Sequence, residues 1–203
     1  ARFIPLAEET GIIIALGTWV LRETCRQVMR WTASGFELPQ VSVNLSVKQL
    51  ERPEFVDTLL AILEETGIEP GRLKLEITES VVMAVDDPFT LLDRLCKIGI
   101  SLALDDFGTG YSSLSYLKML PVQQLKIDRS FVIGIGQNTE DEAIIRSVMA
   151  LAQSLNFEVV AEGVETAEQA AFLSDSGCHQ LQGFLHGSAV APAEFRARWA
   201  LLR

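Results

Sequence analysis

The chain has 203 residues, of which 48% are hydrophobic and 22% are charged, and its formal net charge is −10. This length and composition suit one sizeable core, so we predict a single domain over residues 1–203. So acidic a chain is poorly suited to bind the phosphate backbone of nucleic-acid polymers, and no apolar run reaches the roughly 18 residues of a membrane span.

The cysteines indicate a reducing environment. Cys25, Cys96 and Cys178 are odd in number and show no CxxC spacing. This pattern argues against a disulfide framework or a structural zinc site. Because no signal-peptide pattern is present either, we expect a cytoplasmic protein without membrane contact.

Periodicity divides the chain into alternating helices and strands. Apolar residues at helical spacing begin near Pro5, with a break or bend at Gly11. The elements expected after them, in chain order, are a strand at 41–46, a helix at 55–67, a strand at 73–79, a helix at 87–99, strands at 101–106 and 124–128, a helix at 141–155, a strand at 158–164, a helix that opens at Thr166, a strand at 180–185 and a helix from Pro192. Asp87-Pro88 is a start signal, Thr166 with Gln169 forms a capping box, and Gly67 and Gly99 are stop signals.

Six strands that alternate with helices predict an α/β fold with a parallel sheet, either open and doubly wound or closed into a barrel. Each strand has a polar residue near its carboxyl end: Asn44, Glu76, Asp105, Lys126, Glu162 and Gln182. A barrel directs all of its strand ends at one mouth, whereas the outer strands of an open sheet lie too far apart, so the pattern favours a barrel. For Lys126 and Gln182 the alternative is that they only fill the barrel interior.

Asp105 and Asp106 are adjacent carboxylates at the end of an apolar strand. Two buried anions side by side need a cation or a shared proton. Carboxylate and amide oxygens suit Mg²⁺ or Mn²⁺. Two such ions about 4 Å apart, bridged by Asp105, would activate a water for in-line phosphoryl displacement, with Lys126 positioning that water or neutralising charge. The P-loop, HExxH and GxSxG motifs are absent.

Seven motifs of one known family occur in order along the chain. They are Phe3-Ile-Pro-Leu-Ala-Glu-Glu-Thr-Gly11, Val43-Asn44-Leu-Ser46, Glu76-Ile-Thr-Glu79, Asp105-Asp-Phe-Gly-Thr-Gly110, Lys126-Ile-Asp128, Ala161-Glu-Gly-Val-Glu165 and Gln182-Gly-Phe184. On these motifs the chain resembles the EAL domain family over essentially its whole length. The resemblance implies a TIM-type (β/α) barrel that hydrolyses the bacterial second messenger cyclic di-GMP to linear pGpG with two Mg²⁺ or Mn²⁺ ions.

The resemblance also implies roles for individual residues. Asn44, Glu76 and Asp105 match ligands of one ion, Asp105 and Asp106 match ligands of the second, and Glu162 completes the metal shell. Lys126 matches the residue that contacts the attacking water. Glu79 matches the anchor of the loop at residues 107–113, which in this family couples the metal site to dimerisation, although a solvated carboxylate is the alternative. Glu165 and Gln182 match positions near the metals or the substrate, and for these a structural role is the alternative.

The chain departs from the family pattern in two places. The Glu-Ala-Leu signature is absent, since the chain begins at Ala1-Arg-Phe. One metal-ligating glutamate and the first two barrel strands are then missing, and we expect a fragment of a longer protein. The second departure is at residues 182–190, where the family has an aromatic residue at His186 and a basic residue followed by proline at Ser188 and Ala189. We assign no role to His186, because a lone histidine on a loop is usually a surface group.

Three functions stay open at this stage. The first is a cyclic di-GMP phosphodiesterase, favoured because the catalytic-type positions that the chain covers hold the family's residues. The second is a catalytically inactive cyclic di-GMP receptor, and the third is a dimerisation or signal-relay module. The resemblance further implies a homodimer and fused or partner sensor or diguanylate cyclase domains.

Overall fold

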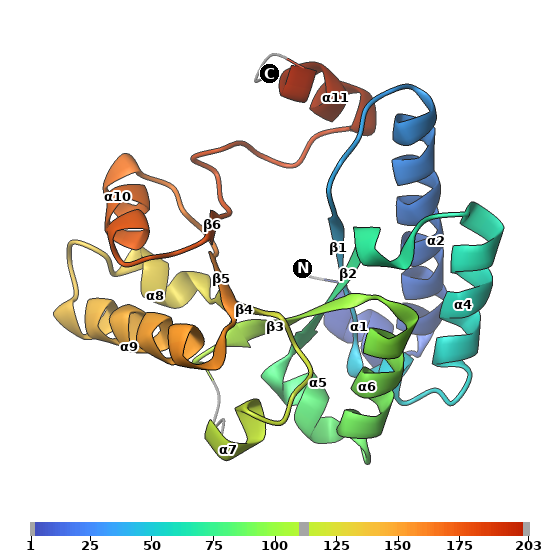
Figure 1. Cartoon of the computed structure of the whole chain (residues 1–203), viewed down its shortest axis with the longest axis horizontal. Coiled ribbons are helices and arrows are strands. Elements are labelled where there is room, and N and C mark those ends of the chain that lie inside the picture. The colour runs from blue at the N-terminus through green and yellow to red at the C-terminus, as the bar shows by residue number, and fades with distance from the viewer. Residues whose placement is uncertain (1–2, 110–113, 201–203) are drawn as a thin grey trace. The chain divides into compact units, whose positions relative to one another are not determined.

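The computed structural model describes residues 3–109 and 114–200 and has an α/β architecture (Figure 1). Its strands are β1 (Val41–Asn44), β2 (Leu73–Thr78), β3 (Ser101–Phe107), β4 (Gln124–Ile127), β5 (Glu158–Ala161) and β6 (Gln180–Leu181). Its helices are α1 (Ile4–Glu9), α2 (Ile12–Ala33), α3 (Val47–Leu50), α4 (Phe55–Thr66), α5 (Glu79–Ala84), α6 (Pro88–Ile98), α7 (Leu114–Leu117), α8 (Arg129–Ile133), α9 (Thr139–Leu155), α10 (Ala167–Asp175), α11 (Pro192–Ala200) and the short 3₁₀ helix η1 (Pro70–Arg72). None of the helices in these ranges is long and apolar enough to cross a membrane.

The strands follow one another in the sheet in chain order, from β1 to β6. Neighbouring strands from β3 to β6 are parallel. In register, Gln124 of β4 lies opposite Ala103 of β3 and Glu158 of β5, and Val160 of β5 lies opposite Gln180 of β6. Parallel strands bring their carboxyl ends to the same edge of a sheet, so residues at these ends are placed for a common site.

The chain divides into two compact units. The first unit is Ala1–Lys74 with Ser188–Arg203, and the second is Leu75–Gly187. In the first unit α2 packs against α4, and Leu21 and Cys25 of α2 and Ile62 of α4 are fully buried or nearly so. Arg22 and Arg26 of α2 both pair with Glu65 of α4, at 3.0 and 2.5 Å. The first unit therefore has an apolar helix interface with charged groups at its border.

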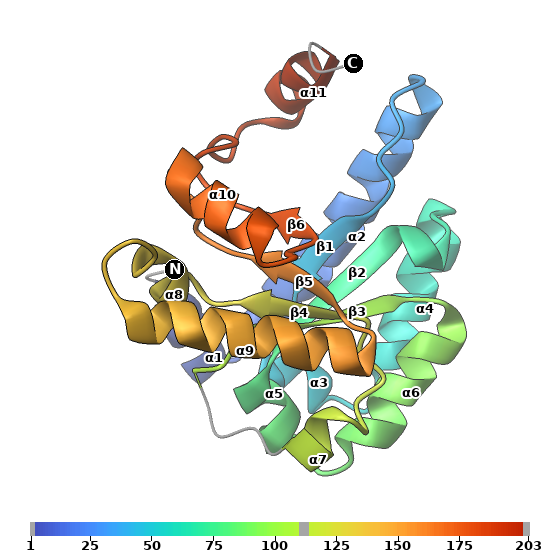
Figure 2. The same ribbon diagram turned by 60° about the vertical axis from the view of Figure 1, so that its left-hand side comes forward.

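The second unit places helices against the strands that carry the candidate site. α9 packs on β4 and β5, while α5 and α6 pack on β3 (Figures 1 and 2). The strand interiors are apolar, with Leu102 and Leu104 of β3, Leu125 and Ile127 of β4 and Val159 of β5 at most 1% exposed. Strands buried on both faces are typical of parallel sheets covered by helices.

Local signals place most of the helix ends correctly. Gly11, with φ 76°, separates α1 from α2, and Gly67 and Gly99 end α4 and α6 in the left-handed conformation. Asp87 caps α6 through the amide of Thr90. The start predicted for the helix at 141–155 is two residues late, because Asn138 caps α9 through the amide of Glu140.

Four strand predictions are too long at the carboxyl end, three of them because a helix begins there. Ser46, placed in the strand at 41–46, is the N-cap of α3 and shares a capping box with Gln49. Glu79, placed in the strand at 73–79, is the first residue of α5, which Thr78 caps. Asp128, placed in the strand at 124–128, caps α8. The strand at 158–164 ends at Ala161 before Gly163, whose φ is 69°.

The strand predicted at 180–185 is also too long, since β6 contains only Gln180 and Leu181. After Leu181 the regular strand pairing with β5 ends. The amide of Leu185 instead donates to the carbonyl of Val164, in the segment that follows β5, at 3.0 Å. Gln182 therefore follows the strand instead of lying within it. Alternation of polar and apolar residues extends into such loops, so it overstates strand length.

Candidate functional site

The second unit brings four of the predicted residues together at the carboxyl ends of β2 to β5. Glu76 lies on β2, Asp105 on β3 and Lys126 on β4, and Glu162 directly follows β5. Glu76, Asp105 and Lys126 are buried, and Glu162 is partly exposed. Because each strand supplies one member, the cluster is a product of strand order and not of any local motif.

Lys126 is the centre of the cluster. Its Nζ lies 2.7 Å from Glu76 Oε2, 2.9 Å from Asp105 Oδ1 and 2.6 Å from Glu162 Oε1. The lysine side chain is 3% exposed, so these ion pairs are shielded from solvent. Burial acts to lower the pKa of Lys126, but its hydrogen bonds to Glu162 and Glu76 outweigh this and raise the pKa above its usual value. Lys126 is therefore a cation held by three carboxylates.

The backbone around Asp106 departs from a regular strand. Asp106 has φ 54°, which is uncommon outside glycine, and the pairing of β3 with β4 shifts register between Leu104 and Phe107. The amide of Asp106 donates to Asp105 Oδ1 at 3.1 Å. A bulge of this kind redirects side chains, and here the two successive residues Asp105 and Asp106 each bring one carboxylate oxygen within 4.8 Å of the other.

Asp128 is a further carboxylate close to Asp106. The sequence motifs did not predict a separate role for it. Burial raises the pKa of Asp106, and the nearby Asp105 and Asp128 carboxylates raise it further. The pKa of Asp128 is lowered because hydrogen bonds from Ser130, including its backbone amide at 2.9 Å, outweigh the effect of burial. Asp128 follows Lys126 by two residues, between β4 and α8, and this position at a strand end could have marked it as a candidate site residue.

Three carboxylates have the arrangement of a cation site. One oxygen from each of Asp105, Asp106 and Glu162 lies within 4.8 Å of the others. Burial raises the pKa of Glu162, against the opposing hydrogen bond from Lys126. Carboxylate oxygens that are partly desolvated and close together fit Mg²⁺ or Mn²⁺, since these ions prefer hard oxygen donors.

Glu79 is buried and reaches the segment that follows β3. Its Oε1 accepts a hydrogen bond from the amide of Gly108 at 3.2 Å, so α5 is tied to the turn that comes directly after the aspartate pair. The solvated alternative for Glu79 is wrong, because the residue is only 8% exposed. Of the predicted loop at 107–113, residues 110–113 lie outside the described ranges.

Three other predicted residues are not among the partners of Lys126 or the carboxylate triad. Glu165 is exposed and pairs with Arg129 at 2.7 Å. Gln182 is exposed, and its backbone bonds to Ala161 and Val164. Asn44 is the last residue of β1 in the first unit. Roles for Asn44, Glu165 and Gln182 therefore stay predictions.

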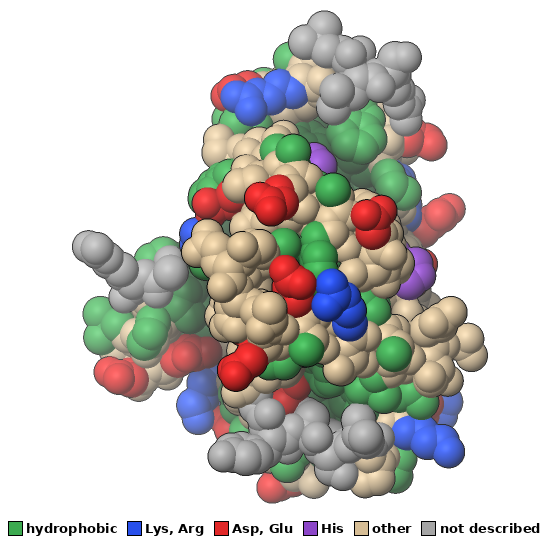
Figure 3. Space-filling view, turned by 90° about the vertical axis from the view of Figure 1, so that its left-hand side faces the viewer, with side chains coloured by type: hydrophobic (Ala, Val, Ile, Leu, Met, Phe, Trp, Pro, Cys, Tyr) green, Lys and Arg blue, Asp and Glu red, His purple; other side chains and the backbone are tan. Residues whose placement is uncertain are grey.

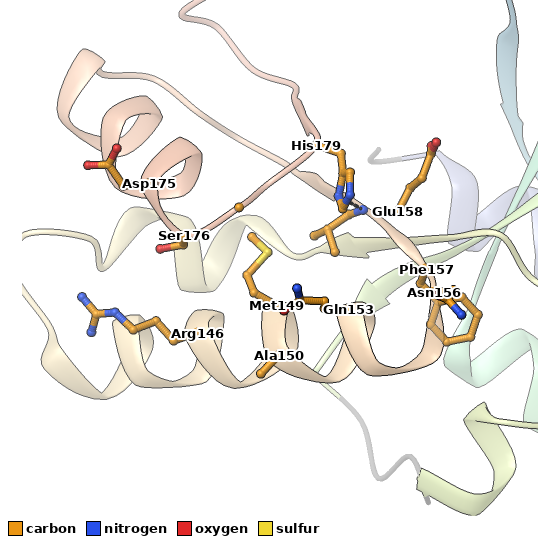
Figure 4. A pocket seen from close by; sticks show the side chains of 12 residues that line it. Arg146, Met149, Ala150, Gln153, Asn156, Phe157, Glu158, Asp175, Ser176 and His179 are labelled. Atoms are coloured by element: carbon orange, nitrogen blue, oxygen red, sulfur yellow. Dashed lines mark hydrogen bonds between the residues drawn. The ribbon is translucent and has the colours of Figure 1, made fainter.

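The second unit also has a cavity that the cluster residues do not line. A cavity of about 670 Å³ lies between α9, α10 and the start of β5, lined by residues that include Met149, Phe157, Glu158 and His179 (Figure 4). It is at the amino ends of the strands, and none of the predicted site residues within the described ranges lines it. On the face shown in Figure 3, acidic side chains are scattered among basic and uncharged ones. We therefore place the candidate site by its chemistry, at the carboxyl ends.

Comparisons with known proteins show the family to which the chain belongs. The EAL domain model matches residues 1–189. The chain is 45% identical over 194 residues to the bifunctional diguanylate cyclase/cyclic di-GMP phosphodiesterase MucR of Pseudomonas aeruginosa, a match that covers 95% of the chain and 28% of MucR. The chain thus spans little more than a quarter of that relative.

Solved structures show the same likeness. A PaMucR phosphodiesterase structure in complex with c-di-GMP has a TM-score of 0.91 at 43% identity, covering 96% of this chain and 79% of that one. A manganese/cy-diGMP complex of Klebsiella pneumoniae BlrP1 has a TM-score of 0.75 at 31% identity, covering 85% and 44%. The predicted α/β fold of the TIM-barrel type is confirmed by these matches, and the chain belongs to the EAL domain family.

Proposed function

We propose that this chain is a phosphodiesterase domain that hydrolyses cyclic di-GMP to linear pGpG with two Mg²⁺ or Mn²⁺ ions. The observation that carries the proposal is the buried Lys126 ammonium, bonded to carboxylates from β2, β3 and the end of β5, with Asp106 alongside. One carboxylate is enough to balance the charge of one buried lysine in an ion pair that serves stability alone. An excess of carboxylates around a lysine suits a site that also takes cations.

The cation ligands in this proposal are Asp105, Asp106 and Glu162, with Glu76 and Asn44 as further ligands. Bound divalent cations supply Lewis-acid activation of a water and neutralise charge on the phosphoryl oxygens. The protein's contribution is a set of oxygens held at fixed strand ends. Without cations, burial and then the like charge of Asp105 raise the pKa of Asp106 and oppose ionisation of both aspartates.

Lys126 orients the attacking water in this mechanism. A lysine ammonium has three N–H donors, and the three contacts to Glu76, Asp105 and Glu162 occupy all of them. Asp105 and Glu162 are also members of the cation-binding triad. If Asp105 and Glu162 held cations, N–H groups of Lys126 would be free to hold the water and to balance negative charge on the substrate phosphate.

Three further residues act at the border of the site. Glu79 holds the turn after β3 through the amide of Gly108, which fixes the direction of the Asp105-Asp106 pair. Glu165 and Gln182 contact the substrate in this proposal, a role that suits their exposure next to the partly exposed Glu162 segment. Residues 1–203 then act as one EAL-type domain.

The test is hydrolysis of cyclic di-GMP with Mn²⁺ or Mg²⁺, followed by chromatography of the product. Glu162→Gln and Lys126→Met should each reduce turnover by about 100-fold or more. Lys97→Met is the matched control, because Lys97 pairs with Asp93 at 2.6 Å on the exposed face of α6. Unchanged turnover in both site variants would contradict the proposed roles.

The alternative functions have distinct outcomes in the same experiment. Tight nucleotide binding without product identifies a catalytically inactive receptor. Absence of both binding and product leaves an interaction module, in which dimerisation or signal relay is the activity. We also propose a fused or partner sensor or cyclase domain, and the two activities named for MucR support the cyclase. We further propose a homodimer, which light scattering on the purified chain tests.

A further inference from the structure

The short segment that carries Glu162 bends at Gly163, and only its last residue, Glu165, is exposed. Residues 162–165 leave β5, and Gly163 has φ 69°, in the region that favours glycine. The two ends of the segment are fixed by hydrogen bonds. The amide of Glu162 donates to the carbonyl of Ile127 at 3.1 Å, and the amide of Glu165 donates to Gln169 Oε1 of α10 at 2.7 Å. The direction of the Glu162 carboxylate therefore depends on how well the bend between these anchors is held.

Arg129 crosses this bend. A Cβ atom built on Gly163 would overlap the Cβ, Cγ and Cδ atoms of Arg129, so the aliphatic stem of the arginine lies directly on the glycine backbone. Beyond the stem, the guanidinium Nη2 lies 2.7 Å from Glu165 Oε1. One side chain thus contacts the middle of the segment and its far end.

Arg129 is itself anchored beside the site. It is the first residue of α8 and directly follows Asp128, which caps that helix through the amide of Ser130 at 2.9 Å. Lys126 lies three residues earlier, on β4. Arg129 therefore connects the β4 end, which carries Lys126, to the segment after β5, which carries the Glu162 partner of that lysine.

We propose that Arg129 is a positioning residue, which holds the segment 162–165 so that the Glu162 carboxylate is directed at Lys126 and the cation-binding triad. The inference rests on the proposed function for its catalytic consequence. An exposed ion pair alone contributes little to stability, and the arginine and glutamate side chains here are 53% and 39% exposed. The stem packed on Gly163 is what makes the contact specific, because only glycine leaves room for it.

The experiment compares Arg129→Ala, Arg129→Met and Arg129→Lys with the parent chain. Methionine keeps much of the stem without the charge, and lysine keeps both the stem and a charge. Lys97→Ala on α6 is the control for loss of an exposed ion pair. Three properties are measured: hydrogen exchange of the amides of residues 163–165 without metal, Mn²⁺ affinity, and kcat and KM for cyclic di-GMP.

For Arg129→Ala we expect several-fold faster exchange confined to residues 163–165, weaker Mn²⁺ binding and a kcat lowered by about tenfold, with a smaller change in KM because Glu165 loses its partner. Arg129→Met should be intermediate, and Arg129→Lys should recover most of kcat. Exchange and kcat of Arg129→Ala equal to those of Lys97→Ala would overturn the proposal, as would faster exchange throughout the second unit. If the parent chain itself makes no product, the proposed function fails, and the exchange and Mn²⁺ measurements still decide whether Arg129 positions the segment.

Discussion

Lys126 shows at the scale of one residue how a buried charge depends on its partners. Its ammonium forms ion pairs with Glu76, Asp105 and Glu162, and its side chain is 3% exposed. Lys126→Met removes the cation and leaves buried carboxylates without a counter-charge. We expect the free energy of unfolding at neutral pH to fall by about 3–5 kcal/mol in metal-free buffer, measured by urea denaturation.

Divalent cations distinguish this explanation from a simple packing defect. Mn²⁺ should raise the melting temperature of Lys126→Met more than that of the parent, because it supplies the missing positive charge to Asp105 and Glu162. Lys97→Met, whose lysine is 74% exposed, should respond to Mn²⁺ as the parent does. An equal Mn²⁺ response in all three proteins would argue that the stability loss comes from packing alone.

Glu65 gives a residue-scale prediction of pH dependence. The hydrogen bonds from Arg26 and then Arg22 hold the pKa of Glu65 below its usual value. A carboxyl with a lowered folded-state pKa stabilises the fold above its unfolded pKa of about 4.3, and the contribution is lost as pH falls through the folded pKa. Glu65→Gln should therefore melt below the parent at pH 7, and the gap should close towards pH 3. A gap of constant size across this range would mean that the ionised form is not what stabilises the α2–α4 contact.

At the scale of the element, α10 links helix capping to the candidate site. Thr166 Oγ1 accepts from the amide of Gln169 at 3.2 Å, and Gln169 Oε1 accepts from the amides of Thr166 at 3.0 Å and Glu165 at 2.7 Å. The same glutamine thus caps the helix and anchors the segment that begins with Glu162. The capping box of Thr166 and Gln169, which the sequence predicted, therefore also helps to fix the end of the segment that carries Glu162.

Thr166→Ala should cost about 1 kcal/mol, the usual effect of losing an N-cap side chain. For a chain of this size that corresponds to a melting temperature lower by roughly 2–4 °C in calorimetry. Ser174→Ala, an exposed position of the same helix, is the control and should change the melting temperature little. Equal effects of the two substitutions would show that the cap does not limit the stability of α10.

At the scale of the whole molecule, cation binding should be visible as stability. An ion that binds only the folded state at 100 times its Kd adds about 2.7 kcal/mol to the free energy of unfolding. We expect Mn²⁺ and Mg²⁺ to raise the melting temperature with saturation, and Glu162→Gln to weaken the effect. NaCl at equal ionic strength controls for screening of the net charge of −10. A rise that follows ionic strength alone would show that no specific cation site is present.

The sequence by itself determined the alternation of strands with the longer helices and most ends of those helices, because these depend on neighbouring residues. It did not predict the short helices α3, α5, α7 and α8. Gly11, Gly67, Gly99, Asp87 and Thr166 act where they were expected to act. The motifs also led to the family, since seven short patterns in fixed order are specific. Strand ends were less predictable, because Thr78 and Asp128 fit an alternating pattern and also cap the helix that follows.

Only the tertiary structure decided which side chains meet. Glu76 and Lys126 are 50 residues apart in the chain, yet their charged atoms lie 2.7 Å apart. Asp128 near Asp106, and Arg129 over Gly163, likewise depend on the order and register of β3, β4 and β5. Periodicity and capping act over a few residues, whereas strand pairing acts between distant segments. The sequence could therefore name most members of the site, but their contacts follow from how the parallel strands pair.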